Sequence, residues 1–289
     1  MRGCKRLVGV SFVLMLVAMT LLPAVLKAAE KQPEAVSVYA LKYGETKTLP
    51  NYAALWMSTR YMPEFETPLT FMYYWLIKTP NQNILVDVGA GTEVGKKLTN
   101  YVPPDVMLSK VGLKPSDINS IIITHGHWDH LEAMDSFKDA KVYIQRAAYR
   151  FTVEEGAEYA FFRRFGYPTR KDSFTLLTLL WDNRLKLLDG NAELFPGIKV
   201  IQVDGHYPGL QLVVVETKEK PIILANDSMH FYANLEKDHA MGLYFGNLRD
   251  VVKGFETIRK LNGIPIPGHD PKVMEQFKRI DAAVVQISP

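Results

Sequence analysis

Residues Ile121–His130 read Ile-Ile-Ile-Thr-His-Gly-His-Trp-Asp-His, and this stretch predicts a buried strand followed by a metal site. The three isoleucines favour a short strand, which we expect to break at Gly126. Around the break, six positions hold four potential ligands: His125, His127, Asp129 and His130. Imidazole and carboxylate groups this close together indicate a divalent metal, and they suit zinc best. A histidine-rich surface loop is the alternative, which four such residues in six positions disfavour.

The first 28 residues have the layout of a secretory signal peptide. Three basic residues precede a nearly unbroken apolar run, Leu7–Leu26, and small residues follow. We expect cleavage after Ala28 and an exported protein, periplasmic or secreted. An uncleaved membrane anchor is the alternative, because about twenty apolar residues could just span a bilayer. Residues 29–289 are then expected to form one domain.

Removal of residues 1–28 changes the charge and the cysteine count. The whole chain carries 34 basic and 31 acidic residues, and this segment holds four of the basic residues and none of the acidic ones. The remainder has 34 − 4 = 30 basic against 31 acidic residues, a net charge of −1, which gives no argument for nucleic-acid binding. The only cysteine, Cys4, leaves as well, so disulfides and a thiolate nucleophile are excluded.

Strand patterns dominate both halves of the remaining chain. The expected strands are residues 36–41, 69–78, 84–88, 141–145, 185–188, 198–203, 210–216, 221–225 and 264–267. The expected helices are residues 147–165, 173–181, 248–261 and 271–280. Two strand-rich halves, each closed by helices, predict two sheets stacked face to face with helices outside.

Two segments between these elements could border a pocket. Residues 51–68 show few periodic signals and are interpreted as a loop that could cover one. The segment 147–165 is rich in aromatic residues that could either wall a substrate pocket or pack in the core: Tyr149, Phe151, Tyr159, Phe161 and Phe162.

Three further potential ligands follow later strands. His206, Asp227 and His269 each come just past an expected strand end, often beside a glycine that permits a sharp turn. Strand ends of a layered fold meet at one edge, so we expect these side chains to join the first cluster. Seven ligands are too many for one zinc and suit two, with Asp227 bridging them.

The ordered set His-Gly-His-Trp-Asp-His, His206, Asp227 and His269 resembles the metallo-β-lactamase superfamily over nearly all of the chain beyond residue 28. The resemblance implies an α/β fold, a four-layer αββα sandwich of two mixed β-sheets flanked by helices. It implies two zinc ions, with iron or manganese as alternatives. One ion would be held by His125, His127 and His206, the other by Asp129, His130 and His269, and Asp227 would be shared. Asp87 resembles the family's carboxylate that orients ligand histidines.

The chain departs from the family pattern at two places. After the Asp-His pair the family usually has a small residue and a glycine, whereas this chain has Leu131-Glu132-Ala133. Tyr207 stands where a small hydroxyl residue is common. Both departures concern the pocket edge and the surroundings of the ligands, and the ligand set itself is intact.

The implied reaction is hydrolysis of a lactone or ester carbonyl by a metal-bridging hydroxide, with Asp129 accepting and relaying a proton. The presence of Asp227 and His130 argues against the commonest β-lactamases, and the nearest pattern is the quorum-quenching N-acyl homoserine lactonase group. That group has a tyrosine three positions past the bridging aspartate, where this chain has His230. We predict that His230 donates a hydrogen bond to the lactone oxygen; the alternative is a rim histidine without a role.

Two other classes of protein remain open. One is another hydrolase on the same scaffold, acting on β-lactams, aryl esters, sulfate esters or phosphoesters. The other is a di-iron redox protein or a metal-binding protein without catalysis. The expected partner is a small-molecule lactone or ester, with no nucleic acid, and with a membrane only through the N-terminal signal or anchor.

Overall fold

The computed structural model describes residues 36–47, 69–159, 168–241 and 245–288. Contacts between residues divide the chain after Gln32, and every described residue belongs to the second unit, Pro33–Pro289. The predictions for residues 1–28 and for the loop 51–68 concern residues outside this set. Among the described residues, no helix is both long and apolar enough to cross a membrane.

The described strands form two mixed sheets. The first sheet has the order β12, β13, β1, β2, β3, β4, β5, β6, antiparallel up to β3 and parallel beyond it. Its strands are β1 (Ser37–Thr46), β2 (Thr70–Lys78), β3 (Asn83–Val86), β4 (Ser120–Ile122), β5 (Lys141–Gln145), β6 (Leu185–Leu188), β12 (Lys278–Asp281) and β13 (Val284–Gln286).

The second sheet has the order β11, β10, β9, β8, β7, and only its β10–β11 pair is parallel. Its strands are β7 (Ala192–Phe195), β8 (Ile198–Gln202), β9 (Gln211–Val215), β10 (Ile222–Asn226) and β11 (Ile264–Pro267). Both sheets are therefore mixed, as the family resemblance implied.

Apolar side chains pack the two sheets against each other. Trp75 and Ile77 of β2 lie in one buried cluster with Val213 of β9 and Leu224 of β10. Neighbouring residues of β2 point to the other face, where Tyr74 belongs to a second buried cluster. Almost all of β2 is buried because both of its faces are covered, as expected for a central strand in a layered protein.

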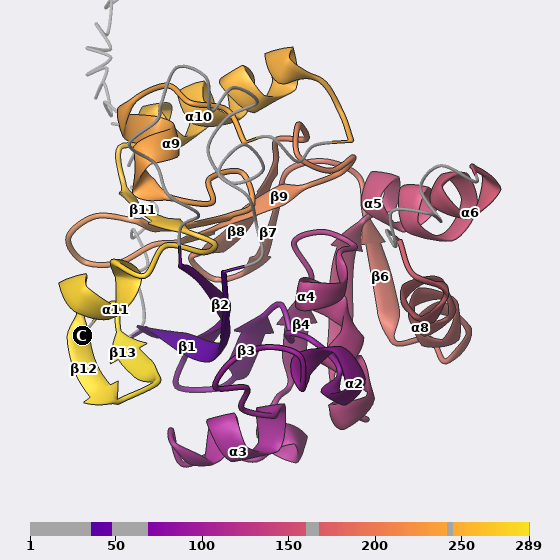
Figure 1. The fold of residues 1–289 in the computed structure, drawn as a ribbon, viewed down its shortest axis with the longest axis horizontal. Coiled ribbons are helices and arrows are strands. Elements are labelled where there is room, and N and C mark those ends of the chain that lie inside the picture. The colour runs from indigo at the N-terminus through magenta and orange to yellow at the C-terminus, as the bar shows by residue number, and fades with distance from the viewer. Residues whose placement is uncertain (1–35, 48–68, 160–167, 242–244, 289) are drawn as a thin grey trace, which may run out of the picture. The chain divides into compact units, whose positions relative to one another are not determined.

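Helices cover the outer faces of both sheets (Figure 1). The longer ones are α3 (Pro104–Ser109), α8 (Arg170–Trp181) and α10 (Leu248–Lys260); the shorter ones are α2 (Thr92–Gly95), α4 (Trp128–Leu131), α5 (Arg146–Arg150), α6 (Gly156–Glu158), α9 (Tyr232–Glu236) and α11 (Val273–Gln276). Met107 of α3 and Leu179 of α8 pack on the first sheet. Asn247 begins α10 by accepting a hydrogen bond from the Asp250 backbone N–H (3.0 Å). The predicted four-layer αββα sandwich is confirmed.

One predicted helix is largely wrong. Residues 271–280 form only the single turn α11, and at Phe277 the backbone becomes extended (φ −118°, ψ 168°) and enters β12. β12 pairs with β13, which pairs with β1, so this C-terminal hairpin extends the first sheet and not the second. The hydrogen bonds that join β12 to β13 and β13 to β1 stabilise the extended conformation, although the apolar residues recur at helical spacing. β7 was not expected either.

The segment 147–165 is helical over the part that the structure describes. α5 continues through a π-helical turn, Phe151–Glu155, into α6. Turns of this kind are uncommon and often occur near functional sites. Here the turn places Phe151 and Thr152 beside the loop that follows β4. Phe161 and Phe162 lie outside the described residues.

Candidate metal centre

The loop after β4 carries the first four potential ligands. His127 has an extended backbone (φ −74°, ψ 154°) and begins the short helix α4, whose first turn directs Asp129 and His130 back toward His125. Gly126 is required between the two histidines, because a Cβ there would lie 2.2 Å from Thr152 Oγ1 and 2.7 Å from the Tyr207 hydroxyl. All four side chains are buried.

The other three expected ligands come from the ends of strands in the second sheet. His206 follows β8, Asp227 follows β10 and His269 follows β11. Asn226 turns the chain with a positive φ of 45°, and its side chain accepts a 2.6 Å hydrogen bond from Trp75 Nε1. Gly268 allows the close approach of Asp227, whose Oδ1 would lie 2.8 Å from a Cβ at that position. The structure thus brings all seven expected side chains together.

Four of the donors converge on one point. His127 Nδ1 lies 2.9 Å from His125 Nε2 and 3.2 Å from His206 Nε2. Asp227 Oδ2 lies 3.3 Å from His206 Nε2 and 3.7 Å from His125 Nε2. One donor atom of each of these residues lies within 4.8 Å of the others, the arrangement of a group that could hold one ion.

A second group lies on the other side of Asp227. Asp129 Oδ2 is 3.4 Å from His130 Nε2 and 3.7 Å from His269 Nε2. Asp227 Oδ1 is 3.4 Å from His130 Nε2 and 3.2 Å from His269 Nε2. The carboxylate of Asp227 therefore directs one oxygen at each group, which is the geometry of a bridging ligand.

The chemistry of these donors fits a pair of metal ions. His130 Nε2 and Asp227 Oδ1 are buried and make no hydrogen bond of ordinary geometry, although each points into the cluster. Burial, which excludes water from a charged ring, lowers the pKa of His125 and His206 well below the usual value and that of His127 to about 4. These three imidazoles are consequently neutral at pH 7 and present lone pairs, as metal ligation requires.

The acidic neighbours of His130 and His269 favour the protonated form of both imidazoles in the metal-free protein. Burial alone would lower the pKa of His130 and His269, but Asp227 and Asp129 beside them raise both above the usual value. We expect zinc binding at pH 7 to displace protons from His130 and His269, because a ligating nitrogen must be deprotonated. Calorimetric titrations in buffers of different ionisation enthalpy would measure this release, which should vanish at pH values above the raised pKa of His130. Proton uptake or no proton exchange at pH 7 would contradict the assignment.

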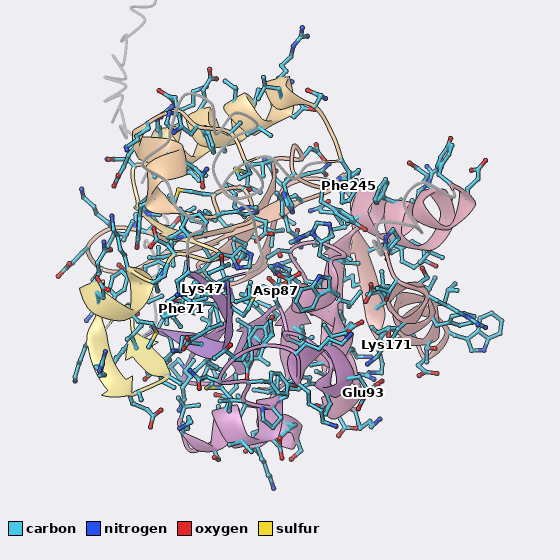
Figure 2. All side chains as sticks on the ribbon, viewed as in Figure 1. Lys47, Phe71, Asp87, Glu93, Lys171 and Phe245 are labelled. Atoms are coloured by element: carbon cyan, nitrogen blue, oxygen red, sulfur yellow. The ribbon has the colours of Figure 1, made fainter. Side chains whose placement is uncertain are left out.

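Asp87 directly follows β3, has a positive φ of 62° and lies in the interior of the molecule (Figure 2), where its carboxylate contacts the loop after β4. Its Oδ1 accepts a hydrogen bond from the Thr124 backbone N–H (2.7 Å), and its Oδ2 accepts bonds from the Thr124 hydroxyl (2.8 Å) and from His130 Nδ1 (2.7 Å). His125 Nδ1 lies 3.1 Å from the same hydroxyl. These bonds fix the tautomers that leave Nε2 of both histidines facing the cluster.

Substitution Asp87→Asn should weaken metal binding without removing a ligand. The amide keeps the shape but carries no charge and presents an N–H₂ group toward His130 Nδ1 or Thr124, so the tautomer is no longer fixed. We expect the Kd for zinc to rise by about 10- to 100-fold, the usual cost of losing such a partner. Competition with a chromophoric chelator would measure it. Asp189→Asn at an exposed ion pair with Arg146 is the control, and equal Kd values for both variants would contradict this role.

Tyr207 fills the space behind the ligand histidines. Its ring packs against His125, His127 and Phe151, with centroid separations of 5.3, 4.9 and 4.9 Å. Its hydroxyl lies 2.8 Å from Thr152 Oγ1, and burial raises its pKa well above the usual value. The departure from the family pattern at this position therefore changes the packing of the ligands and leaves their donor atoms in place.

Aromatic side chains border the cluster. Phe245 lies 5.4 Å from the His127 ring and 5.6 Å from the Phe151 ring, measured between centroids, and it is only partly buried. The sequence pattern singled out Phe151 but not Phe245, which reaches the centre through a hydrogen bond from its backbone N–H to His206 O (2.8 Å). Tyr159 is 54% exposed and does not border the centre.

His230 is not a rim residue. It is 2% exposed, and its Nε2 lies 3.3 Å from Asp227 Oδ2. Together with Asp227 and His269 it forms a third group whose donor atoms lie within 4.8 Å of one another. Within the part of the chain that the structure describes, His239 is the one histidine that belongs to none of these groups.

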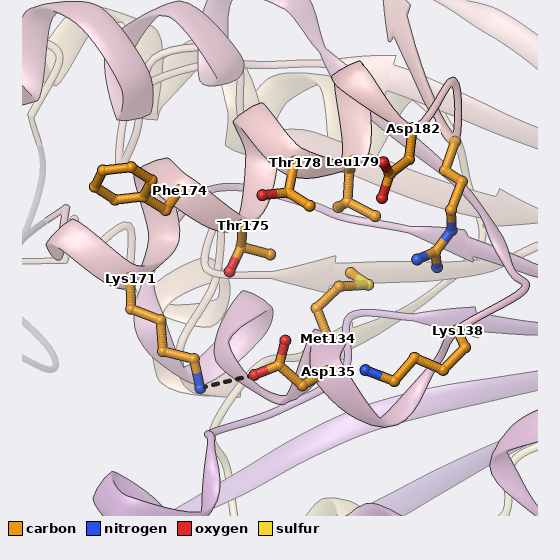
Figure 3. A pocket seen from close by; sticks show the side chains of 10 residues that line it. Met134, Asp135, Lys138, Lys171, Phe174, Thr175, Thr178, Leu179 and Asp182 are labelled. Carbon is orange, nitrogen blue, oxygen red and sulfur yellow. Dashed lines mark ion pairs between the residues drawn. The ribbon is translucent and has the colours of Figure 1, made fainter.

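A separate cavity of about 430 Å³ lies between α8 and the turn after α4 (Figure 3). Three basic and two acidic side chains line it, and among them Lys171 and Asp135 form an ion pair of 3.6 Å. None of its lining residues belongs to the groups around Asp227. The cavity is therefore not part of the candidate metal centre.

Comparison with known proteins agrees with this geometry. Residues 69–275 match the model of the metallo-beta-lactamase superfamily. An N-acyl homoserine lactonase of Bacillus cereus is 26% identical over 193 residues, 66% of this chain and 71% of that protein. The N-acyl homoserine lactonase AttM of Rhizobium radiobacter is 26% identical over 245 residues, 75% of this chain and 87% of that protein.

Solved structures show the same fold. An N-acyl homoserine lactone hydrolase with the product N-hexanoyl-L-homoserine at its catalytic metal centre has a TM-score of 0.67 and 19% identity, over 86% of this chain and 97% of that one. AidC, a dizinc quorum-quenching lactonase, has a TM-score of 0.64 and 18% identity, over 83% and 89%. The fold and the buried groups of ligands define a metal-dependent hydrolase. The chain belongs to the metallo-beta-lactamase superfamily.

Proposed function

We propose that this protein is an exported dinuclear zinc hydrolase that opens the lactone ring of N-acyl homoserine lactones. The observation that carries the proposal is the carboxylate of Asp227, which directs one oxygen at each of two groups of buried donors. The similarity to two N-acyl homoserine lactonases, over 66% and 75% of the chain, supports the choice of substrate.

The proposal includes an assignment of the ligands to the two ions. His125, His127 and His206 would hold one zinc ion, Asp129, His130 and His269 would hold the other, and Asp227 would be shared. The chemistry that the two ions supply when bound is a hydroxide nucleophile at neutral pH and polarisation of the lactone carbonyl. Iron or manganese would occupy the same nitrogen and oxygen donors, so the native metal is part of the proposal.

Asp129 is the residue assigned to proton transfer. Its contacts with His130 and His269 are made through Oδ2 (3.4 and 3.7 Å), which leaves Oδ1 to accept a proton from the attacking water and pass it to the alkoxide that leaves. Its side chain is 10% exposed, more than that of Asp227, so it lies closer to the open side of the centre.

The border of the centre suits an acylated substrate. Phe245 is half-buried beside His127 and Phe151, and Trp128 packs partly buried against the core. Such apolar walls beside a few convergent polar groups are typical of sites for small ligands with a hydrocarbon part.

Export is proposed from the sequence of residues 1–28, with its basic start and apolar run. A diffusible lactone outside the cytoplasm is a suitable substrate for an exported enzyme. N-terminal sequencing of the protein recovered from a periplasmic extract and from the medium would test it. A chain that begins after Ala28 supports a cleaved signal, and a chain found only inside the cytoplasm would contradict export.

A panel of substrates on zinc-loaded full-length protein tests the reaction. Proton release in a weakly buffered indicator assay would follow ring opening of N-acyl homoserine lactones of several chain lengths, beside β-lactams, chromogenic aryl esters and phosphoesters. We expect the lactones to give the highest kcat/KM. An ester or phosphoester turned over while every lactone stays closed would contradict the lactonase proposal and indicate another hydrolase on this scaffold.

A further inference from the structure

His230 is a buried imidazole whose ring nitrogens both lack a hydrogen-bond partner. A neutral imidazole has one N–H donor and one lone pair, and leaving a buried polar group unpaired costs about 1–3 kcal/mol. Another partner is therefore expected for this ring, on the side that it faces. That side is the shared carboxylate of the candidate metal centre.

The distance between His230 and Asp227 suits two ligands of the same metal ion. Nε2 of His230 is 3.3 Å from Asp227 Oδ2, whereas N–H···O hydrogen bonds usually measure about 2.7–3.2 Å. Two ligands bound to a tetrahedral zinc at about 2.1 Å lie about 3.4 Å apart. The His230 ring also lies between those of His206 and His269, with centroid separations of 5.0 and 5.3 Å.

The backbone holds His230 in this position. The His269 N–H donates a hydrogen bond to His230 O (2.9 Å), and the Gly268 N–H donates one to Met229 O (2.9 Å). Asp227 lies three residues earlier, in the turn that follows β10. The three donors of this group thus come from two loops that are bonded to each other, so the backbone positions that carry them are fixed relative to one another.

We propose that His230 is a metal ligand that binds, with Asp227 and His269, one of the divalent ions of the centre. The centre then has eight protein donors instead of seven. The inference rests on the proposed dinuclear centre and differs from the hydrogen bond to substrate that the sequence suggested for His230. An added imidazole holds the ion more tightly and occupies a coordination position that a substrate oxygen would otherwise use.

The test measures metal binding by the full-length protein and two variants. His230→Phe removes both ring nitrogens, whereas His230→Gln keeps an N–H donor for a carboxylate or a lactone oxygen but is a poor zinc ligand. His239→Gln is the matched control, since His239 is the histidine outside the groups of donors. Zinc competition with a chromophoric chelator gives the Kd of each ion, and the visible spectrum of the cobalt(II) form reports the ligand set.

Both His230 variants should raise the Kd of one ion by more than about 100-fold, beyond the 10- to 100-fold typical of a lost orienting partner, and should change the cobalt spectrum. His239→Gln should leave both readouts unchanged. Wild-type affinity and spectrum in His230→Gln would overturn the inference, whether or not His230→Phe binds normally. If His230→Phe does not fold, His230→Gln decides the question alone.

The same experiment separates this inference from the proposed function. Wild-type protein that binds two zinc ions, with unchanged binding in His230→Gln, would overturn only the role of His230. Wild-type protein that binds no divalent ion would overturn the dinuclear centre itself. A fall in the mean number of imidazoles per ion in X-ray absorption spectra, from wild type to His230→Gln, would support ligation directly.

Discussion

The substitution Asp227→Asn should abolish metal binding at both positions of the proposed centre. The amide has nearly the same shape, but it has lost the charge and one of the two oxygens that face the donor groups. Both positions should lose zinc, and kcat/KM for the best lactone should fall by at least about 10³-fold, which corresponds to about 4 kcal/mol of activation free energy. Metal content by mass spectrometry and the lactone assay on the same sample would measure both effects.

The control for this variant is Asp270→Asn. Asp270 is buried and adjacent to His269, but its carboxylate accepts hydrogen bonds from the backbone N–H groups of Tyr232 (3.0 Å) and Lys272 (2.9 Å). It should lose some stability and keep its zinc. A full complement of zinc in Asp227→Asn, with activity within about tenfold of wild type, would show that Asp227 does not bridge.

Removal of the metal should destabilise the folded protein markedly. In the metal-free state Asp227 and Asp129 remain buried among imidazoles, and the attraction of His130 and His269 helps to offset the cost of burying their charges. Zinc that binds only the folded chain, at about 1,000 times its Kd, contributes about 4 kcal/mol. At roughly 2–4 °C per kcal/mol for a chain of this size, Tm should fall by on the order of 10 °C on chelation.

Return of zinc should restore both Tm and activity, whereas magnesium should not, because nitrogen-rich sites favour zinc over magnesium. Asp227→Asn supplies the matched comparison: its Tm should scarcely respond to the chelator, since little zinc is bound to it. The wild-type protein is fully loaded with zinc before the chelator is added. If its Tm is the same with and without chelator, the assignment of the metal centre is contradicted.

Much of this structure could be predicted from local patterns. Two of the three isoleucines before Thr124 lie in the buried strand β4, and the strands before His206, Asp227 and His269 ended close to the expected positions. Alternating or continuous apolar runs indicate which strands are buried, so the two sheets and their stacking could be predicted from the sequence. Ligand positions at strand ends followed from the same reasoning.

Features that depend on contacts between distant parts of the chain could not be predicted from the sequence. The residues of β12 were interpreted as part of a helix because local spacing does not show that β12 pairs with β13, nor that β13 pairs with β1. Phe245 borders the centre only because its backbone is hydrogen-bonded to His206 across the fold. The sequence singled out His230, but its burial against the Asp227 carboxylate depends on the loop of His269 and could not be predicted.

The central claim is that two zinc ions around Asp227 open a lactone, and a single titration tests it most directly. Metal-free full-length protein is titrated with zinc while bound metal and the hydrolysis of an N-acyl homoserine lactone are followed in the same sample. We predict that two ions bind per chain and that activity rises to its maximum as the second position fills. Full activity without metal, or two bound ions with no opening of any lactone, would contradict the account.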